Sequence, residues 1–269
     1  MTGSPVNPRI DSPKCRSTYS TATAKRAVPN SRVVQASVTP TERGEDRTDS
    51  DGTLIIDPAG DIILDVADGE AGKEVVSYRV SSAPLMHASG YFRTLLSSDA
   101  FAEGATITKT HEELRARYMN LADAPITELP RLKIFDAGRI GAVKSIRPLM
   151  KDFLQILHAQ DMSIRKPPLS NIVNLAIVAD RFDAIGLVGE WIRKRWPLGK
   201  APTDSYTEES SRQRLLVGMI FDYEPWIAVP SFQLVCHGSS QWTGNAKNRN
   251  PLWWDMPFGL EGSRTSSSV

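Results

Sequence analysis

The chain has 269 residues, of which 41% are hydrophobic and 23% charged, a composition typical of a globular core accompanied by polar segments. Its 32 basic residues nearly balance its 31 acidic ones, so overall charge does not hold it to nucleic acid or membrane. Two distant cysteines, Cys15 and Cys236, exclude a disulfide framework and a cysteine zinc site. They favour a reducing compartment, cytoplasmic or nuclear, over secretion.

The first segment, residues 1–52, is rich in Ser, Thr and Pro and is predicted to be a disordered tail. Its acid-poor composition also fits an organelle transit peptide, although five prolines interrupt any amphipathic helix there. No apolar run approaches the length of a membrane span, and the amino terminus lacks the apolar block of a secretory signal.

The folded region is expected to begin near Thr53, where a short apolar run precedes the turn residues 57–60. Alternating apolar residues over 61–66 and 75–80, separated by turn residues, predict a β-hairpin. Asp61 and Asp65 fall on the face opposite the apolar one. Two carboxylates there are expected to be solvated rather than to perform acid–base chemistry.

An amphipathic helix is predicted next, capped by Ser81 or Ser82 with Pro84 in its first turn. Its apolar positions recur three and four residues apart, at Leu85, Ala88, Ser89, Phe92, Leu95 and Leu96. Thr110 to Glu113 matches a capping box, which predicts a short helix continuing past Leu114 to Leu121. Glu128 to Phe135 is compatible with a short strand, and Gly138 and Gly141 indicate an exposed loop.

Helices alone are expected after that loop. One starts at Pro148 and ends near His158, whose partly protonated imidazole would complement the helix carbonyls. Ser170 would cap the next helix, and a third would end before Pro197. Two further helical segments are predicted over 212–221 and 226–235. The order predicts an α+β fold, a small β-sheet covered by a helical cluster.

Three parts of the chain together resemble a BTB/POZ domain of the form common in fungal proteins. They are residues 60–64 with 78–92, Phe101-Ala102-Glu103-Gly104, and residues 153–158 with 175–183. Residues 217–234 are similar to the helical extension that follows such domains. The resemblance implies a BTB/POZ-like domain over 53–197 with a longer insertion at about 105–147, a helical C-terminal extension over 198–237, and a flexible tail over 238–269.

From the function of the family, the resemblance also implies that this chain is a non-enzymatic protein–protein interaction module. No motif in the chain shows this function by itself. Its partner would be a second copy, in a homodimer, or another protein. Family members with transcriptional roles carry a His and a basic residue before the first helix, beside the strand Asp. Ser81 and Ser82 stand at those positions, so the charged pocket is expected to be missing.

Five residues are candidates for partner binding. Phe101 and Glu103 match the apolar–x–Glu motif with which related ubiquitin-ligase adaptors contact a cullin, and an aromatic beside a carboxylate suits such a contact physically. The alternative is that Phe101 packs on its own domain. Leu85, Tyr91 and Phe92 lie in the region that the family uses for self-association, although they also form the core stripe of their helix.

No catalytic, metal-binding or cofactor-binding motif is recognised. Four scattered histidines do not make a metal site, and no dinucleotide fingerprint, phosphate loop or nucleophile elbow is present. Two other functions stay open: a substrate adaptor of a cullin-RING ubiquitin ligase, and an enzyme with a deep pocket lined by Asp61, His158 or Asp161. Neither nucleic acid nor membrane is expected as a partner.

Overall fold

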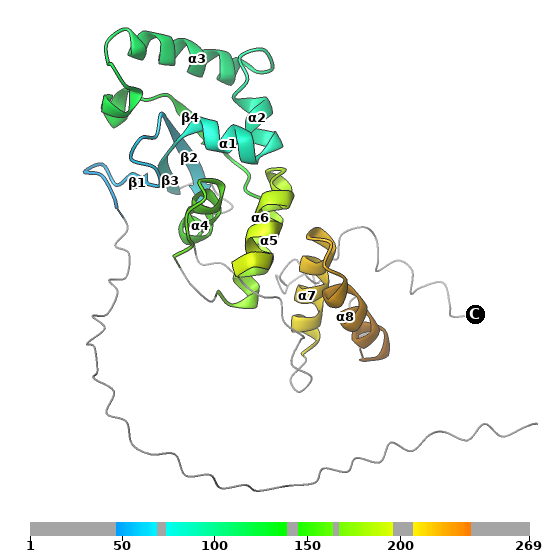
Figure 1. The fold of residues 1–269 in the computed structure, drawn as a ribbon. Helices are drawn as coiled ribbons and strands as arrows, with labels where there is room; N and C mark the ends of the chain where they lie inside the picture. Colours follow the sequence, from blue (N-terminus) through cyan, green and yellow to red (C-terminus); the bar gives the residue numbers. More distant parts are fainter. Residues whose placement is uncertain (1–46, 69–73, 139–144, 164–166, 196–206, 238–269) are drawn as a thin grey trace, which may run out of the picture. The chain divides into compact units, whose positions relative to one another are not determined.

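A four-stranded sheet organises the computed structural model, which describes residues 47–68, 74–138, 145–163, 167–195 and 207–237 (Figure 1). Its strands are β1 (Leu54–Ile55), β2 (Ile62–Asp68), β3 (Glu74–Val80) and β4 (Arg131–Ile134), in the spatial order β1-β3-β2-β4. The predicted hairpin is confirmed, since β2 and β3 pair antiparallel. β4, the predicted short strand, runs parallel to β2 and forms an edge. The predicted α+β class is therefore correct.

The predicted first helix is interrupted in the middle. α1 (Ser82–Ala88) and α2 (Gly90–Leu95) are separated by Ser89, whose backbone is extended at φ −136° and ψ 124°. The Ser89 hydroxyl accepts a hydrogen bond from the Phe92 amide and so caps α2. A Cβ on Gly90 would lie 1.9 Å from a carboxylate oxygen of Asp183, so any larger residue here would have to displace the Asp183 side chain. Helical periodicity continues across the break, which is why the sequence conceals it.

The helix predicted from the Thr110 capping box begins eight residues earlier. α3 (Ala102–Arg115) contains Thr110 near its middle, where the hydroxyl donates to the Thr106 carbonyl one turn back. A threonine that bonds within the helix in this way satisfies no free N-terminal amide, so the box motif was misleading. Two 3₁₀ turns follow α3, η1 (Leu121–Asp123) and η2 (Ile126–Glu128).

Three longer helices complete the domain: α4 (Arg147–Leu157), α5 (Leu169–Arg181) and α6 (Ile185–Arg195). Pro148 occupies the first turn of α4, as predicted. Ser170, however, is not a cap, because α5 already begins at Leu169 after Pro168. Gly138, expected in an exposed loop, is half-buried at φ +98° against Ile177, while Gly141 lies outside the described residues.

The main core lies between one face of the sheet and helices α1, α2, α4, α5 and α6, and it continues through Leu216, Val217, Phe221 and Trp226 into the last two helices. At its centre the Phe92 and Phe182 rings stack with centroids 5.3 Å apart, and Phe153 packs on Phe182 at 5.4 Å. These three phenylalanines are fully buried, and such aromatic pairs contribute about 0.5–1.5 kcal/mol beyond their buried area. The helical cluster predicted to cover the sheet is thus present.

The opposite face of the sheet is also covered, by α3, η1 and η2. A second apolar cluster on that face joins Ile63 of β2 to Leu114, Ala124, Ile126 and Leu129. Asp65, predicted to be solvated there, is buried; it accepts hydrogen bonds from the Ser77 hydroxyl and from Arg131, at 2.6 and 2.9 Å. Residues 114–129 of the segment expected as an insertion, at about 105–147, therefore help to cover the second face of the sheet.

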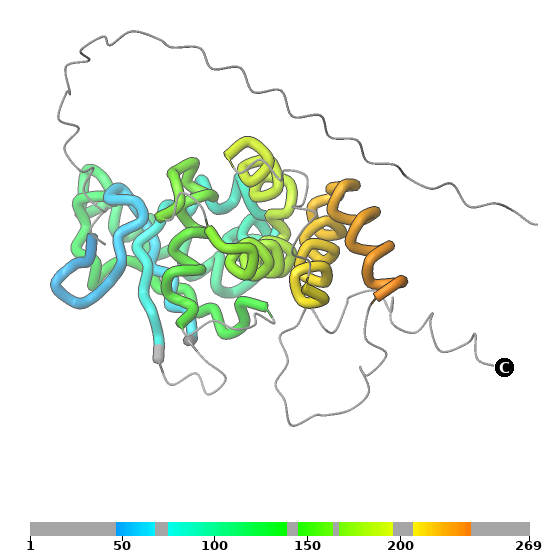
Figure 2. Tube along the Cα trace, turned by 90° about the horizontal axis from the view of Figure 1, so that it is seen from below, coloured from blue at the N-terminus to red at the C-terminus, as the bar shows by residue number. Residues whose placement is uncertain are grey.

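The last helical pair, α7 (Glu208–Ile220) and α8 (Glu224–His237), matches the two predicted segments. A Cβ on Gly218 of α7 would lie 2.9 Å from the Trp226 backbone, so glycine lets α8 pack closely. α7 also contacts α5 (Figure 2). Arg193 of α6 donates a hydrogen bond to the Phe221 carbonyl at 2.9 Å. The predicted tails, 1–52 and 238–269, fall outside the described residues except for residues 47–52.

Candidate functional site

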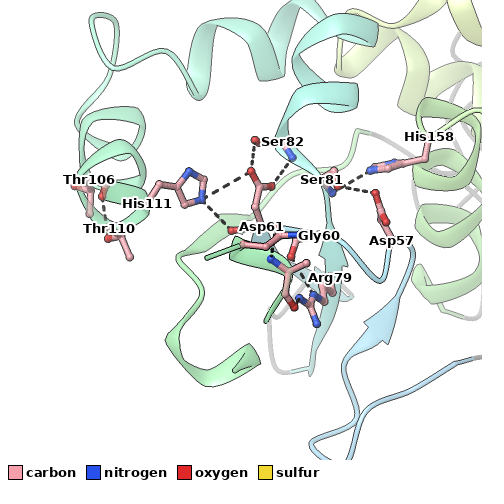
Figure 3. A network of polar contacts seen from close by, with 12 residues as sticks. Asp57, Gly60, Asp61, Arg79, Ser81, Ser82, Thr106, Thr110, His111 and His158 are labelled. Atoms are coloured by element: carbon pink, nitrogen blue, oxygen red, sulfur yellow. Dashed lines mark hydrogen bonds and ion pairs between the residues drawn. The ribbon is translucent and has the colours of Figure 1, made fainter. Parts of the chain in front are cut away.

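A cluster of carboxylates, serines and histidines surrounds the start of α1 (Figure 3). We call it the cap cluster, and its members are Asp57, Asp61, Ser81, Ser82, His111 and His158. They come from the turn before β2, the junction of β3 with α1, the middle of α3 and the end of α4. Elements distant in sequence therefore meet at one helix terminus.

Asp61 forms one half of the cap cluster. Its carboxylate accepts hydrogen bonds from both the amide and the hydroxyl of Ser82, each at 2.7 Å. The Nε2 atom of His111 lies 2.9 Å from the Asp61 carbonyl and 4.0 Å from a carboxylate oxygen. A carboxylate that receives a first-turn amide satisfies a donor that has no partner within the helix. Asp61 thus performs the capping that the sequence assigned to serine.

Ser81 and His158 form the other half. The Ser81 hydroxyl donates to Asp57 at 2.6 Å, and the Ser81 amide donates to Nε2 of His158 at 3.1 Å. Nδ1 of the same ring lies 2.8 Å from the Leu154 carbonyl, so the imidazole contacts a carbonyl near the end of its own helix. The predicted end of this helix near His158 is confirmed, because His158 is the C-cap residue of α4.

Asp57 has a perturbed acidity. Burial favours the neutral carboxyl and would raise its pKa, but hydrogen bonds from the Ser81 hydroxyl and the Ala59 amide, together with the nearby His158 and Arg79, outweigh burial. The net result is a pKa below the ordinary value of an aspartate. Arg79 itself is buried and donates to the carbonyls of Gly60 and Ala122, at 3.0 and 2.9 Å. The carboxylate is thus held in its ionised form.

The cap cluster brings serine, histidine and aspartate together without the connectivity of a nucleophile relay. Such a relay needs the serine hydroxyl to donate to the imidazole. Here the Ser81 hydroxyl donates to a carboxylate, and His158 receives the Ser81 amide instead. The arrangement joins the helix terminus to the sheet, and its polar groups are engaged in that role.

A small cavity lies apart from the cap cluster. A cavity of about 50 Å³ lies between α4 and α5, with Pro148, Asp152 and Asn174 in its lining and neither Asp61, His158 nor Asp161. This volume is well below the roughly 300 Å³ at which ligand pockets begin. Asp161, the third residue named for an enzymatic pocket, pairs with Arg195 at the surface.

The two cullin-motif residues lie at the start of α3. Phe101 is the N-cap residue with 49% of its surface exposed, and Glu103 is exposed in the first turn. A carboxylate in a first turn is favoured by the helix dipole. A Cβ on Gly104 would lie 2.2 Å from the Ser97 carbonyl, so the helix start packs tightly on the preceding chain. Phe101 is thus about half exposed and lies outside both apolar clusters.

The three residues expected at a self-association edge lie deeper. Leu85 and Phe92 have no exposed surface and belong to the main core. Tyr91 is half-buried; its ring meets Phe182 edge-on at 5.1 Å, and the Arg181 guanidinium lies 5.8 Å from the ring centroid. Burial therefore assigns Leu85 and Phe92 to packing, and of the three only Tyr91 reaches the surface.

Sequence reasoning missed the partners of the cap cluster. His111 was counted only among four scattered histidines, and Asp57 only as a turn residue. The adjacent serines Ser81 and Ser82, placed directly after a strand, were the available signal, since two hydroxyls there need acceptors from elsewhere in the fold. It also missed the exposed apolar side of α8, described below.

Comparison with known proteins returns no match: no family model, no curated protein and no solved structure. Within the described residues, no group of three or more His, Cys, Asp or Glu side chains is arranged to hold a metal ion. None of the helices described is both long enough and apolar enough to cross a membrane.

Proposed function

We propose that the chain is a non-enzymatic protein–protein interaction module of the BTB/POZ type. The observation that carries this proposal is the exposed Phe101 beside the exposed Glu103 at the start of α3. An aromatic anchor with an adjacent charge supplies both buried area and direction to a protein contact. The α+β architecture, with a hairpin leading into helices, is compatible with the fungal BTB/POZ resemblance.

The cap cluster supports contact rather than chemistry. Its hydroxyls and imidazoles are engaged with the α1 terminus and its neighbours. In particular, Asp61 already binds Ser82, so this carboxylate is not available to form the charged pocket of transcriptional family members. Partner recognition in this chain is therefore proposed to use the start of α3.

A cullin is the second candidate partner, because Phe101 and Glu103 stand where the related adaptors carry their apolar–x–Glu motif. The exposure of both residues favours this candidate over packing within the domain. A substrate adaptor would in addition need a receptor for its substrate. Among the described residues, we assign that substrate-binding role to the extension formed by α7 and α8.

The test compares partners captured by the wild-type chain and by a Phe101→Ala, Glu103→Ala double variant, using affinity purification with mass spectrometry. Loss of a central aromatic contact typically costs more than about 1 kcal/mol, so we expect at least a roughly fivefold loss of affinity for the main partner. Met119→Ala with Glu113→Ala is the matched control, since both residues are exposed, one on α3 and one just after it.

Two results would contradict the proposal. Partners that bind both double variants equally would remove the start of α3 as the docking site. A monomer in light scattering at high concentration, combined with no captured partner, would remove the interaction module itself. Binding of a purified cullin that is weakened only by the Phe101 and Glu103 variant would decide in favour of the adaptor.

A further inference from the structure

α8 presents an apolar surface to the solvent. Its exposed stripe, which we call the α8 outer face, consists of Pro225, Ala228, Val229, Phe232, Val235 and Cys236. These positions recur three and four residues apart and so lie along one side of the helix. Phe232 is 68% exposed and Val235 70%. None of the six side chains carries a charge.

The other side of α8 is apolar as well. Trp226 and Pro230 are buried there, where Gly218 lets α7 approach. A helix that is apolar on both sides is typical of a buried helix. The solvent side of α6 shows the usual contrast, with Glu190 and Lys194 forming an ion pair. The α8 outer face is therefore a surface that is expected to have a cover.

We infer that residues 251–258 of the same chain, Pro-Leu-Trp-Trp-Asp-Met-Pro-Phe, cover the α8 outer face. This segment holds three aromatic residues and follows α8 in the sequence. Thirteen residues separate it from His237 and can span roughly 43 Å when extended. α8, with 14 residues, is only about 21 Å long, so the segment can return along the whole helix.

The exposed area of the α8 outer face favours this segment over a second copy of the chain as its cover. A fully exposed aromatic side chain offers about 200 Å², so Phe232 and its smaller neighbours present on the order of 300–400 Å². A stable dimer buries about 800 Å² on each partner. A tethered segment has an effective concentration in the millimolar range and can therefore cover a surface too small to hold a free partner.

Cys236 provides the probe, because it lies exposed at the end of the α8 outer face. The experiment measures the rate at which a small aromatic disulfide reagent modifies Cys236 in the full chain carrying Cys15→Ser. Trp253→Ala with Trp254→Ala should raise this rate roughly threefold, the ratio for a face that is covered two-thirds of the time. Trp242→Ala is the matched control and should leave the rate unchanged.

A second variant removes the surface instead of its cover. Phe232→Ser should leave the helical circular dichroism intact, since the side chain is mostly exposed, and should raise the Cys236 rate similarly. Combining it with the two tryptophan changes should add little, because both variants disrupt the same contact.

Three results would overturn the inference. They are an unchanged rate in the tryptophan variant, independent and additive effects of the two variants, and a Cys236 rate that falls with increasing protein concentration. The last result would assign the α8 outer face to a second copy.

Discussion

Replacing Asp61 with alanine tests the cap cluster most directly. The change removes the acceptor for the amide and the hydroxyl of Ser82, both at 2.7 Å. Loss of a helix cap costs about 1 kcal/mol, and a part-buried donor left without a partner costs about 1–3 kcal/mol more. The carboxylate is 19% exposed, so solvent replaces the lost contacts only in part. We expect the free energy of unfolding to fall by roughly 2–4 kcal/mol.

The measurement is equilibrium unfolding in urea followed by circular dichroism, in which a lower midpoint with an unchanged slope reports a loss of stability. Asp180→Ala is the control, because Asp180 is an exposed aspartate of α5 and its loss should change stability by less than about 0.5 kcal/mol. Ser82→Ala should overlap in part with Asp61→Ala in a double-mutant cycle, since both remove the bond from the Ser82 hydroxyl, while the bond from the Ser82 amide is lost only in Asp61→Ala. The reasoning fails if Asp61→Ala and Asp180→Ala unfold alike.

Three further predictions concern acidity, close packing and burial. The pKa of Asp57 is lowered in the folded chain, so its stabilising contribution is fully present above the unfolded pKa, near 3.8. This contribution is lost as pH falls through the lower pKa of the folded chain. Asp57→Asn should therefore flatten the pH dependence of the free energy of unfolding in that acidic window and leave its slope near neutral pH unchanged. Gly104→Ala should lower the melting temperature by several degrees, because the added Cβ would lie 2.2 Å from the Ser97 carbonyl, and an unchanged melting temperature would show that the start of α3 is loosely packed. In urea unfolding, Leu85→Ala should lower the free energy of unfolding by about 2–5 kcal/mol, and Phe101→Ala by less than about 1 kcal/mol. Equal losses would contradict the assignment of Leu85 to the core and of Phe101 to the surface.

The sequence predicted best where a pattern repeats along one element. Period-two alternation located β2 and β3, and Pro148 marked the start of α4. The break at Ser89 was missed because it depends on Asp183, which is far along the chain and meets Gly90 only in the folded protein. Local periodicity reports which face of an element is buried and says little about where a distant residue interrupts it.

The candidate site depended on longer-range information. Both histidines of the cap cluster reach their partners across large sequence separations, so no spacing rule links His111 to Asp61 or His158 to Ser81. The second face of the sheet was misjudged for the same reason. Asp65 alternates correctly with apolar residues, yet α3 and its following turns cover that face, and Arg131 supplies the buried carboxylate with a partner.

α3 connects the covered sheet to the proposed docking site. Near the end of α3, Leu114 packs on Ile63 of β2. His111, also on α3, contacts the Asp61 carbonyl beside the α1 terminus. At its other end, Gly104 fits against the Ser97 carbonyl just after exposed Phe101. A side chain presented by a helix that is fixed at several points loses little conformational freedom when a partner binds. Weakening the cap cluster should therefore weaken partner binding as well as stability, although none of its residues belongs to the proposed docking site.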